Sequence, residues 1–285
     1  MDRQGLFQKS RRVSLMFLKA LKKWRQNAEA DLDRDAGRYW SMSDKDERIR
    51  DQSHWYGEGR WEKERWLAYG DFFFDLAGKR LEQASGPDWR AGLKAKTALD
   101  WGCGGGAIAR PLCEHFASVH GVDISAATLY ECRKRMADLA AHEADKGRGE
   151  AGNFNAFHFP SEHPEAVLEL IDPGTVDFIV SVGVFKHFPS QAYTLRVLQV
   201  MEKLLKKEGF LFIQIRYFDG AEKYRPKEGD YARNVITMTS FTADFFAAQL
   251  AAAGLELLHR ERDIDGEDEK HEYYFLGKER VKGAF

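Results

Sequence analysis

The chain has 285 residues, of which 44% are hydrophobic and 31% are charged, and its formal net charge is −2. This composition indicates a soluble protein with one large domain and an appendage, and it argues against a chain-wide field for binding nucleic acid. The three cysteines lack metal-ligand spacing, so we expect a reducing, cytoplasmic location and no metal site. No apolar run reaches the roughly 18 residues that a membrane span needs, and no secretory signal is evident.

The first predicted element is a basic amphipathic helix over residues 7–25. Apolar residues recur there at helical spacing, and lysines and arginines fill the other face. Two interpretations stay open. The helix packs on its own domain or on a second copy in a homo-oligomer, or it contacts an anionic membrane surface or an acidic partner. The second interpretation would add a peripheral location at the inner face of the membrane.

Two further segments precede the main domain. Residues 27–51 are acidic and polar, and we expect a linker or a solvated helix there. Residues 51–74 hold a crowd of tryptophans, tyrosines and phenylalanines beside Gly57 and Gly59. Aromatic residues next to glycine turns suit a lid that folds over a ligand, although the same aromatics would also suit the core of N-terminal helices.

The most informative stretch is residues 97–125. A short apolar strand ends in Asp100, and a glycine turn and an apolar-periodic helix follow it. The turn glycines leave room for the close approach of a ligand; they are Gly102, Gly104, Gly105 and Gly106. A second strand over 119–122 ends in Asp123, whose carboxylate can accept both hydroxyls of a ribose.

Asp100 helps to choose between two classes of ligand. Its carboxylate would repel the pyrophosphate of a dinucleotide, but it would attract an ammonium or a sulfonium. The run D-W-G-C-G-G-G resembles the first motif, D-x-G-x-G-x-G, of the class I S-adenosylmethionine-dependent methyltransferases, and Asp123 matches the acidic residue that closes their second strand. The resemblance implies S-adenosylmethionine as cofactor. It also implies cofactor contacts from Asp100, Gly102, Cys103, Gly104, Asp123, Ile124 and Ser181.

The remaining elements fit the fold that this resemblance implies. We predict strands over residues 154–159, 176–182, 210–216, 255–263 and 271–277. Ser190 should cap a helix from Gln191 to about Lys207, and Thr242 should cap another, with Phe241 and Phe246 as a hydrophobic staple. The expected fold class is α/β: a doubly wound, seven-stranded, mostly parallel sheet with a C-terminal antiparallel hairpin and a helical N-terminal extension.

We divide the chain into a helical extension and cap over 1–93 and a cofactor-binding catalytic domain over 94–285. In small-molecule methyltransferases an aromatic N-terminal cap closes over the cofactor, so Tyr56 and Arg60 are candidates to contact its methionine carboxylate. One departure from the family stands out. The run F-H-F-P-S-E-H after the third predicted strand lacks an acidic residue directly behind that strand, so the adenine contact is left open between His158 and Ser161.

Residues 183–190, G-V-F-K-H-F-P-S, resemble the V-L-H-H-x-P stretch of the same enzymes, and His187 matches the second histidine. Besides a plain helix-entry residue, His187 is the candidate general base, because an imidazole of reference pKa about 6.5 accepts protons near neutral pH. A pocket for the acceptor is expected from Lys186, Arg216, Tyr217 and Arg233.

The leading hypothesis is therefore a methyltransferase that acts on a hydroxyl of a small polar acceptor, such as a sugar, a nucleotide-sugar or a specialised metabolite. An N-methyltransferase on a small amine is the closest alternative. An NAD(P)-dependent oxidoreductase and a non-catalytic, membrane-associated binding protein are remote alternatives. Nucleic acid is not an expected partner, because no added RNA-binding module is evident.

Overall fold

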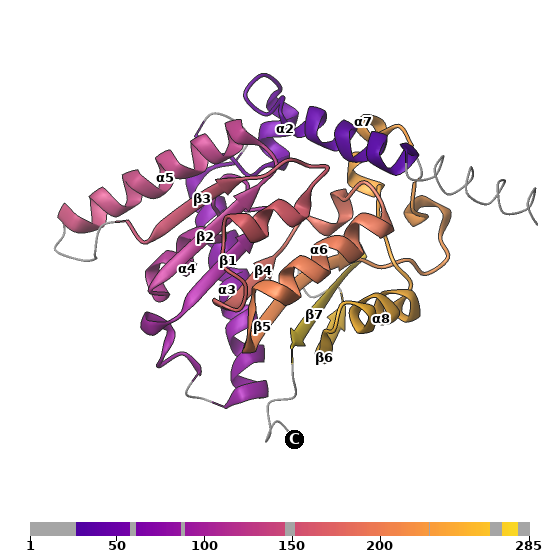
Figure 1. Ribbon diagram of the computed structural model, residues 1–285. Helices are drawn as coiled ribbons and strands as arrows, with labels where there is room; N and C mark the ends of the chain where they lie inside the picture. The colour runs from indigo at the N-terminus through magenta and orange to yellow at the C-terminus, as the bar shows by residue number, and fades with distance from the viewer. Residues whose placement is uncertain are drawn as a thin grey trace, which may run out of the picture.

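A computed structural model describes residues 27–57, 61–86, 89–145, 152–227, 229–262 and 270–278. Within these residues, seven strands form one sheet in the order β3-β2-β1-β4-β5-β7-β6 (Figure 1). The strands are β1 Thr97–Trp101, β2 Ser118–Asp123, β3 Phe154–His158, β4 Val176–Ser181, β5 Leu205–Arg216, β6 Glu256–Arg262 and β7 His271–Gly277.

Strands β1 to β5 pair in parallel, whereas β7 lies antiparallel between β5 and β6. The predicted seven-stranded sheet with its C-terminal antiparallel hairpin is therefore confirmed. The chain order reverses between β1 and β4, and ligands of open α/β sheets bind at the carboxyl ends of the strands beside such a reversal.

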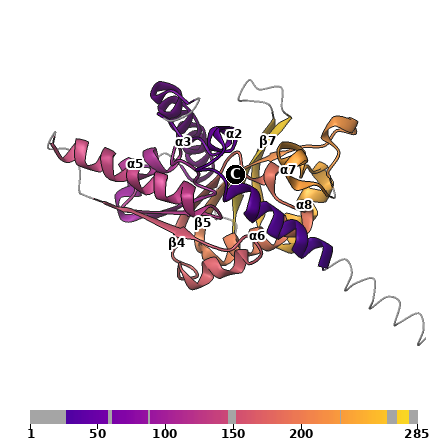
Figure 2. The same ribbon diagram turned by 90° about the horizontal axis from the view of Figure 1, so that it is seen from above.

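Helices cover both faces of the sheet, as Figure 2 shows for α3 and α6. The helices are α2 Glu47–Gln52, α3 Lys63–Ser85, α4 Ala109–His115, α5 Ala126–Asp145, α6 Gln191–Leu204, α7 Tyr231–Asn234 and α8 Ala243–Ala252. Short 3₁₀ helices are η2 Leu93–Ala95, η3 Pro164–Glu169, η4 Phe185–His187, η5 Glu222–Tyr224 and η6 Val235–Thr237. Residues of α6 and α8 build the core on one face, and residues of α3 and α4 build it on the other.

Two helix starts follow directly from their side chains. Ser190 Oγ accepts a hydrogen bond from the Tyr193 backbone N–H, and Thr242 Oγ1 accepts one from Phe245 N–H. These bonds satisfy amides that a helix cannot pair internally. The rings of Phe241 and Phe246 lie 4.9 Å apart across the second start. Both predicted caps and the predicted staple are confirmed.

The end of α6 differs from the prediction. The helix stops at Leu204, and residues 205–216 form the long strand β5, so the expected extension of the helix to Lys207 is wrong. Leu205 is buried and pairs with Val176 at the start of β4, and Lys206 Nζ reaches the Asp177 carboxylate at 2.7 Å. Pairing with the sheet therefore outweighs the helical propensity of this lysine-rich segment.

The segment expected to be a linker or a solvated helix is part of the core. Residues 27–40 form a helix that lies across the carboxyl-end edge of the sheet beside α7 (Figures 1 and 2). Ala36, Tyr39 and Trp40 are buried against Tyr231 and its neighbours. Asp46 then caps α2. The acidic composition of this stretch masked a narrow apolar stripe.

The basic helix expected over residues 7–25 lies outside the described residues, so its two interpretations stay predictions. The boundary at residue 93 also stays a prediction. Helix α3 precedes that boundary, yet Phe73, Phe74 and Leu81 of α3 share one hydrophobic cluster with strands of the sheet. Among the described helices, none combines the length and hydrophobicity needed to cross a membrane.

Candidate active site

Two cavities open at the carboxyl ends of β1 and β4. We call the first the glycine-turn cavity; its walls include Gly102, Gly104, Asp123, Trp40 and Tyr193. We call the second the α3 cavity; its walls include Trp61, Arg65, Tyr69 and Lys186. Both cavities are lined by Gln52, His54, Gly183 and His187, so they meet at this group.

The glycine turn depends on conformations that only glycine adopts easily. Gly102 and Gly104 have φ of 75° and 51°, in the left-handed region. A Cβ atom on Gly105 would lie 2.4 Å from the carbonyl oxygen of His54, and the Gly105 N–H donates to the Ser53 carbonyl at 2.6 Å. The close approach that the glycines permit is thus an approach by the chain's own segment 53–54.

Asp123 ends β2 and faces the glycine-turn cavity. Its two carboxylate oxygens accept hydrogen bonds from the backbone N–H groups of Ser125 at 2.8 Å and Gly104 at 3.1 Å. Burial raises the pKa of this carboxyl above its usual value, and the two backbone donors oppose that rise. Each oxygen keeps a second lone pair, which is available to a donor in the cavity.

Asp100 lies behind the turn and does not line either cavity. Its side chain is 2% exposed and accepts a hydrogen bond from the Ala109 backbone N–H. Burial, reinforced by the nearby Asp123 carboxylate, raises the pKa of Asp100 to about 8. In this structure the Asp100 carboxyl holds the turn at the start of α4, and its direct contact with a ligand stays a prediction.

The other predicted cofactor residues divide into two groups. Gly102, Gly104 and Ile124 line the glycine-turn cavity. Cys103 and Ser181 are buried and do not line it; the Cys103 thiol contacts Cys132, and Ser181 Oγ donates to the Trp101 carbonyl at 2.9 Å.

Of the two cap residues predicted to contact the cofactor, the structure describes only Tyr56. Tyr56 does not line the glycine-turn cavity; its ring packs on Trp66 at 4.8 Å and lies under the Arg135 guanidinium at 4.4 Å. Arg60 lies outside the described residues. At the open adenine position, His158 Nε2 bonds the Ile124 carbonyl at 3.1 Å, while Phe159 lines the cavity.

His187 is held in one orientation at the junction of the cavities. Its Nδ1 lies 2.8 Å from the Val235 carbonyl oxygen, which can only accept, so Nδ1 carries the proton and Nε2 keeps a lone pair. The Trp40 ring packs edge-on at 5.2 Å. Trp40 Nε1 donates to the Tyr231 hydroxyl, which in turn donates to the His187 carbonyl at 2.6 Å.

Burial changes the acid–base character of both junction histidines. Burial and, to a smaller extent, the positive charge of Lys186 together lower the pKa of His187 and of His54 to about 3. Each imidazole is therefore neutral near pH 7. The value of about 6.5 assumed from the sequence does not hold for His187.

The predicted acceptor residues do not form one pocket. Lys186 lines the α3 cavity, but Arg216 is buried and donates to the Ile236 carbonyl. Tyr217 is buried beneath the Arg262 guanidinium at 4.4 Å, and Arg233 is exposed. Within segment 217–240 the tyrosines Tyr217, Tyr224 and Tyr231 are buried, whereas Arg233 lies in solvent.

Several residues of the site escaped prediction. His54 has φ of 57° and lies between Trp61 and Tyr69, with ring centroids 4.5 and 4.8 Å away. Its place beside Gly57 in the aromatic stretch was the one available signal. Trp40 and Tyr231 meet across 191 positions of sequence, and no local pattern marks such a pair.

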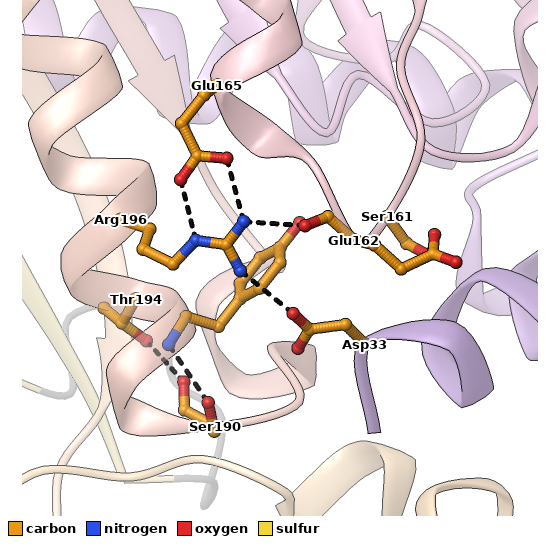
Figure 3. A network of polar contacts seen from close by, with 8 residues as sticks. Asp33, Ser161, Glu162, Glu165, Ser190, Thr194 and Arg196 are labelled. Atoms are coloured by element: carbon orange, nitrogen blue, oxygen red, sulfur yellow. Dashed lines mark hydrogen bonds and ion pairs between the residues drawn. The ribbon is translucent and has the colours of Figure 1, made fainter. Parts of the chain in front are cut away.

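A polar network fastens the helix over residues 27–40 to α6 (Figure 3). Arg196 of α6 donates to Asp33 at 3.0 Å, to both Glu165 oxygens, and to the Glu162 carbonyl. Asp33 is buried, and burial raises its pKa to about 7 against the lowering effect of Arg196. The network fixes the helix that carries Ala36 and Trp40 into the glycine-turn cavity.

Comparison with known proteins agrees with this geometry. Residues 99–211 match the family described as "Methyltransferase domain". A "Ubiquinone biosynthesis O-methyltransferase" of Pseudomonas paraeruginosa is 30% identical over 126 residues, which cover 44% of this chain and 47% of that protein. A protein of the same name from Burkholderia vietnamiensis is 32% identical over 125 residues, with coverage of 44% and 46%. The chain thus spans about half the length of these curated relatives.

Solved structures share the fold at low identity. Magnesium protoporphyrin IX methyltransferase from Synechocystis PCC 6803, solved with bound S-adenosylhomocysteine, aligns with a TM-score of 0.58 at 14% identity, covering 87% of this chain and all of that one. A Leishmania major S-adenosylmethionine-dependent methyltransferase aligns with a TM-score of 0.54 at 17% identity, covering 86% and 82%.

Residues 99–211 therefore match a methyltransferase family, and the strand order and glycine turn agree with the fold of S-adenosylmethionine-dependent methyltransferases. This result favours a methyltransferase over a nicotinamide-dependent oxidoreductase. Within the described residues, no cluster of three or more histidine, cysteine, aspartate or glutamate side chains is arranged to hold a metal ion.

Proposed function

We propose that the chain is an S-adenosylmethionine-dependent O-methyltransferase that acts on a hydroxyl of a small acceptor. One observation carries the proposal: the glycine-turn cavity and the α3 cavity meet at His187, whose Nε2 lone pair is left to accept a proton. A methyl donor in the first cavity and an acceptor in the second would then face each other beside a base.

The residues of the glycine-turn cavity fit the cofactor. Asp123 has free lone pairs for ribose hydroxyls, and Gly104 permits close approach. Asp100 lies buried beneath the turn with its pKa raised to about 8, so it supports the turn as a mostly protonated group near pH 7 and does not add a charge to the cavity. When bound, S-adenosylmethionine supplies a methyl group activated by its positively charged sulfur.

Binding also requires the cap to move. The glycine-turn cavity has a volume of about 90 Å³, whereas ligand sites usually measure about 300–1,000 Å³. Segment 53–54 rests directly on the glycine turn. We therefore propose that this segment withdraws to admit the cofactor and that residues 51–69 close over it afterwards, as the aromatic stretch suggested.

His187 acts in this proposal as the proton acceptor. Its Nδ1–H bond to Val235 fixes the tautomer, and the Trp40 edge fixes the ring. An oxygen acceptor must lose its proton as the new bond forms, so a fixed neutral imidazole is useful there. The names of the relatives, which specify O-methylation, support the same choice.

An amine acceptor is less well supported. Arg65 and Lys186 line the α3 cavity against one acid, Asp51. The net charge of these three side chains is positive, and it disfavours the binding of a protonated amine. Sugars, nucleotide-sugars and specialised metabolites all remain within the proposed class of hydroxyl acceptors.

The proposal is tested first by calorimetry with S-adenosylmethionine, S-adenosylhomocysteine, NAD and NADP. We expect binding of the two sulfur ligands and none of the dinucleotides; the reverse pattern would overturn the proposal. Hydroxyl compounds and amines are then screened for methyl uptake by mass spectrometry. Products methylated at nitrogen alone would replace the O-methyltransferase with an N-methyltransferase.

A further inference from the structure

We infer that the α3 cavity binds an aromatic hydroxy compound with an acidic substituent, so that the acceptor is an anionic phenol. This inference rests on the proposed function, because it assigns the acceptor of the same site. It narrows the hydroxyl acceptors suggested by the sequence to one chemical class, in which a flat ring, an acidic group and a phenolic oxygen occur together.

The first support is the aromatic wall. Trp61 and Tyr69 lie 5.2 Å apart with their rings at 89°, and Tyr69 packs on Phe73 at 4.8 Å. All three line the α3 cavity, together with the His54 ring. The cavity has a volume of about 490 Å³, which suits a small aromatic molecule. Ring edges and faces arranged in this way favour another ring over a hydrated sugar.

The second support is the apolar rim. Phe72 of α3 and Ile236 of η6 both line the cavity, and their exposed fractions are 44% and 42%. Large apolar side chains left in solvent at the mouth of a cavity mark a surface that a ligand covers. A fully polar acceptor would gain little from covering them.

The third support is the charge on the wall. Arg65, in the first turn of α3, stacks over the ring of Trp61, which precedes the helix, at 4.2 Å. Lys186 of η4 lines the same cavity, and Asp51 is the acid of the lining. With His54 and His187 neutral, Arg65, Lys186 and Asp51 sum to one net positive charge, which an acidic substituent would balance; the remaining histidine of the lining, His271, can only add to that charge.

The reaction itself favours a phenol. Burial leaves His187 a weak base, with a pKa of about 3. A phenolic hydroxyl has a pKa of about 10, whereas an aliphatic hydroxyl resembles water, at about 15.7. In the step, the acceptor oxygen bonds the methyl carbon as the carbon–sulfur bond breaks, the hydroxyl proton passes to His187 Nε2, and the sulfonium becomes a neutral thioether. The pKa difference between the acceptor hydroxyl and His187 is smaller for a phenol than for an aliphatic alcohol. A weak base therefore contributes more to the deprotonation of a phenol.

The test uses three probes with the full chain and saturating S-adenosylhomocysteine. 6-Hydroxynaphthalene-2-sulfonate has a ring, a hydroxyl and an anion; 2-naphthol lacks the anion; glucose 6-phosphate lacks the ring. Binding is followed by probe fluorescence for the two naphthols and by calorimetry for all three. We expect the sulfonate to bind most tightly, 2-naphthol next, and glucose 6-phosphate most weakly.

Variants separate the two contributions. Arg65→Ala should weaken sulfonate binding by roughly three- to tenfold and leave 2-naphthol within about twofold, since one partly exposed charge is removed. Phe72→Ala should weaken both naphthols alike. Lys63→Ala is the matched control, because Lys63 is exposed on the first turn of α3 and does not line the cavity.

Equal affinity of the sulfonate and 2-naphthol, or equal effects of Arg65→Ala and Lys63→Ala, would overturn the anionic part of the inference. Tighter binding of glucose 6-phosphate would overturn the aromatic part. Methyl transfer with S-adenosylmethionine distinguishes the two levels: turnover on an aliphatic hydroxyl but not on the naphthols defeats this inference and leaves the proposed function intact. If S-adenosylhomocysteine itself does not bind, both fail.

Discussion

The two cavities that meet at His187 are built from different material. The glycine-turn cavity takes its shape from backbone: positive-φ glycines, strand ends and two amide bonds to Asp123. The α3 cavity takes its shape from side chains, several of them on one helix, including Arg65, Tyr69 and Phe72. A wall of backbone is hard to change by substitution, whereas a wall of side chains changes with each residue. The first therefore suits a fixed cofactor, and the second suits a variable acceptor.

The largest effect should come from the residue at the boundary between them. His187→Ala should lower turnover by roughly 10²–10⁴-fold, the usual contribution of a positioned base, and leave cofactor binding unchanged. His187→Gln is the companion variant, since it keeps side-chain polarity and removes the imidazole. Steady-state kinetics and calorimetry measure the two quantities. A near-normal rate in both variants would remove His187 from the mechanism.

The same residue gives a pH test. Because burial lowers its pKa to about 3, the imidazole stays in its neutral, proton-accepting form at every higher pH. We therefore expect no rise of the methyl-transfer rate near pH 6.5 that depends on His187. The wild-type protein and His187→Gln should have pH profiles of the same shape in that range. Such a rise would mean that the histidine becomes accessible to water when the cap opens.

The next effect tests the backbone-built side. Asp123→Ala should cost about 1.5–3 kcal/mol of cofactor binding, the value of hydrogen bonds to a charged group. Asp123→Asn keeps a hydrogen-bond acceptor for the N–H of Gly104 or Ser125, so it should lose less cofactor affinity than Asp123→Ala. Asp172→Ala, at an exposed aspartate outside the cavity, is the control. Unchanged affinity in Asp123→Ala would place the cofactor elsewhere.

A third variant tests the contact between the cap and the turn. In Gly105→Ala the new Cβ would lie 2.4 Å from the His54 carbonyl oxygen, so segment 53–54 must withdraw. We expect the free energy of unfolding to fall by about 1–3 kcal/mol, and amide exchange across residues 51–57 to accelerate. S-Adenosylhomocysteine should slow exchange across residues 51–57 and 61–69 of the wild-type protein.

Gly92→Ala is the matched control, because its new Cβ would meet only the end of the Lys96 side chain, at 3.7 Å. Similar exchange in the two alanine variants would show that segment 53–54 does not depend on the glycine turn for its position. Exchange that the ligand does not alter would argue against closure of the cap.

The smallest effect concerns the network in Figure 3. Burial raises the pKa of Asp33 to about 7 from 3.8, so the folded state binds more protons than the unfolded state between these values. The contribution of Asp33 to stability should therefore fall as pH rises from about 4 to 7 and then level off. The ion pair with Arg196 offsets part of the desolvation cost of Asp33. We therefore expect the free energy of unfolding to fall by about 1 kcal/mol through this group over that pH range.

Thermal unfolding of Asp33→Asn at pH 5 and pH 8 measures this difference. The stability of Asp33→Asn minus that of the wild type should be larger at pH 8 than at pH 5. Asp31→Asn, at an exposed position of the same helix, should show no such change. An identical pH dependence in all three proteins would mean that Asp33 stays ionised throughout.

The sequence foretold the elements whose signals are local. Alternating strand and helix patterns, the side chains of Ser190 and Thr242, and the spacing from Asp100 to Asp123 each act within a few residues or a single βαβ unit. Side-chain direction was less accessible. Ser181, Cys103 and Tyr56 sit close in sequence to the expected contacts, but each turns toward the core because a backbone carbonyl, a thiol or a tryptophan lies there.

Contacts between distant segments were not accessible at all. The stretch over residues 27–51 was expected to be a linker or a solvated helix because it is acidic and polar. The apolar stripe of its helix becomes meaningful only against Tyr231 and Val235. Likewise, the pKa of His187 depends on how deeply the cap buries it, which its neighbours in sequence do not reveal.

The chain of bonds from Trp40 through Tyr231 to His187 bears on how such enzymes diversify. The matched methyltransferase region, residues 99–211, contains His187, the proposed base, but not Trp40, Tyr231 or Val235, which hold it in place. Grafting that region alone between relatives would carry over the cofactor machinery and leave the base without its support. A functional exchange would have to move three separate segments together, those that hold Trp40, His187 and Tyr231. The part of the sequence that determines acceptor choice is therefore longer than the matched region.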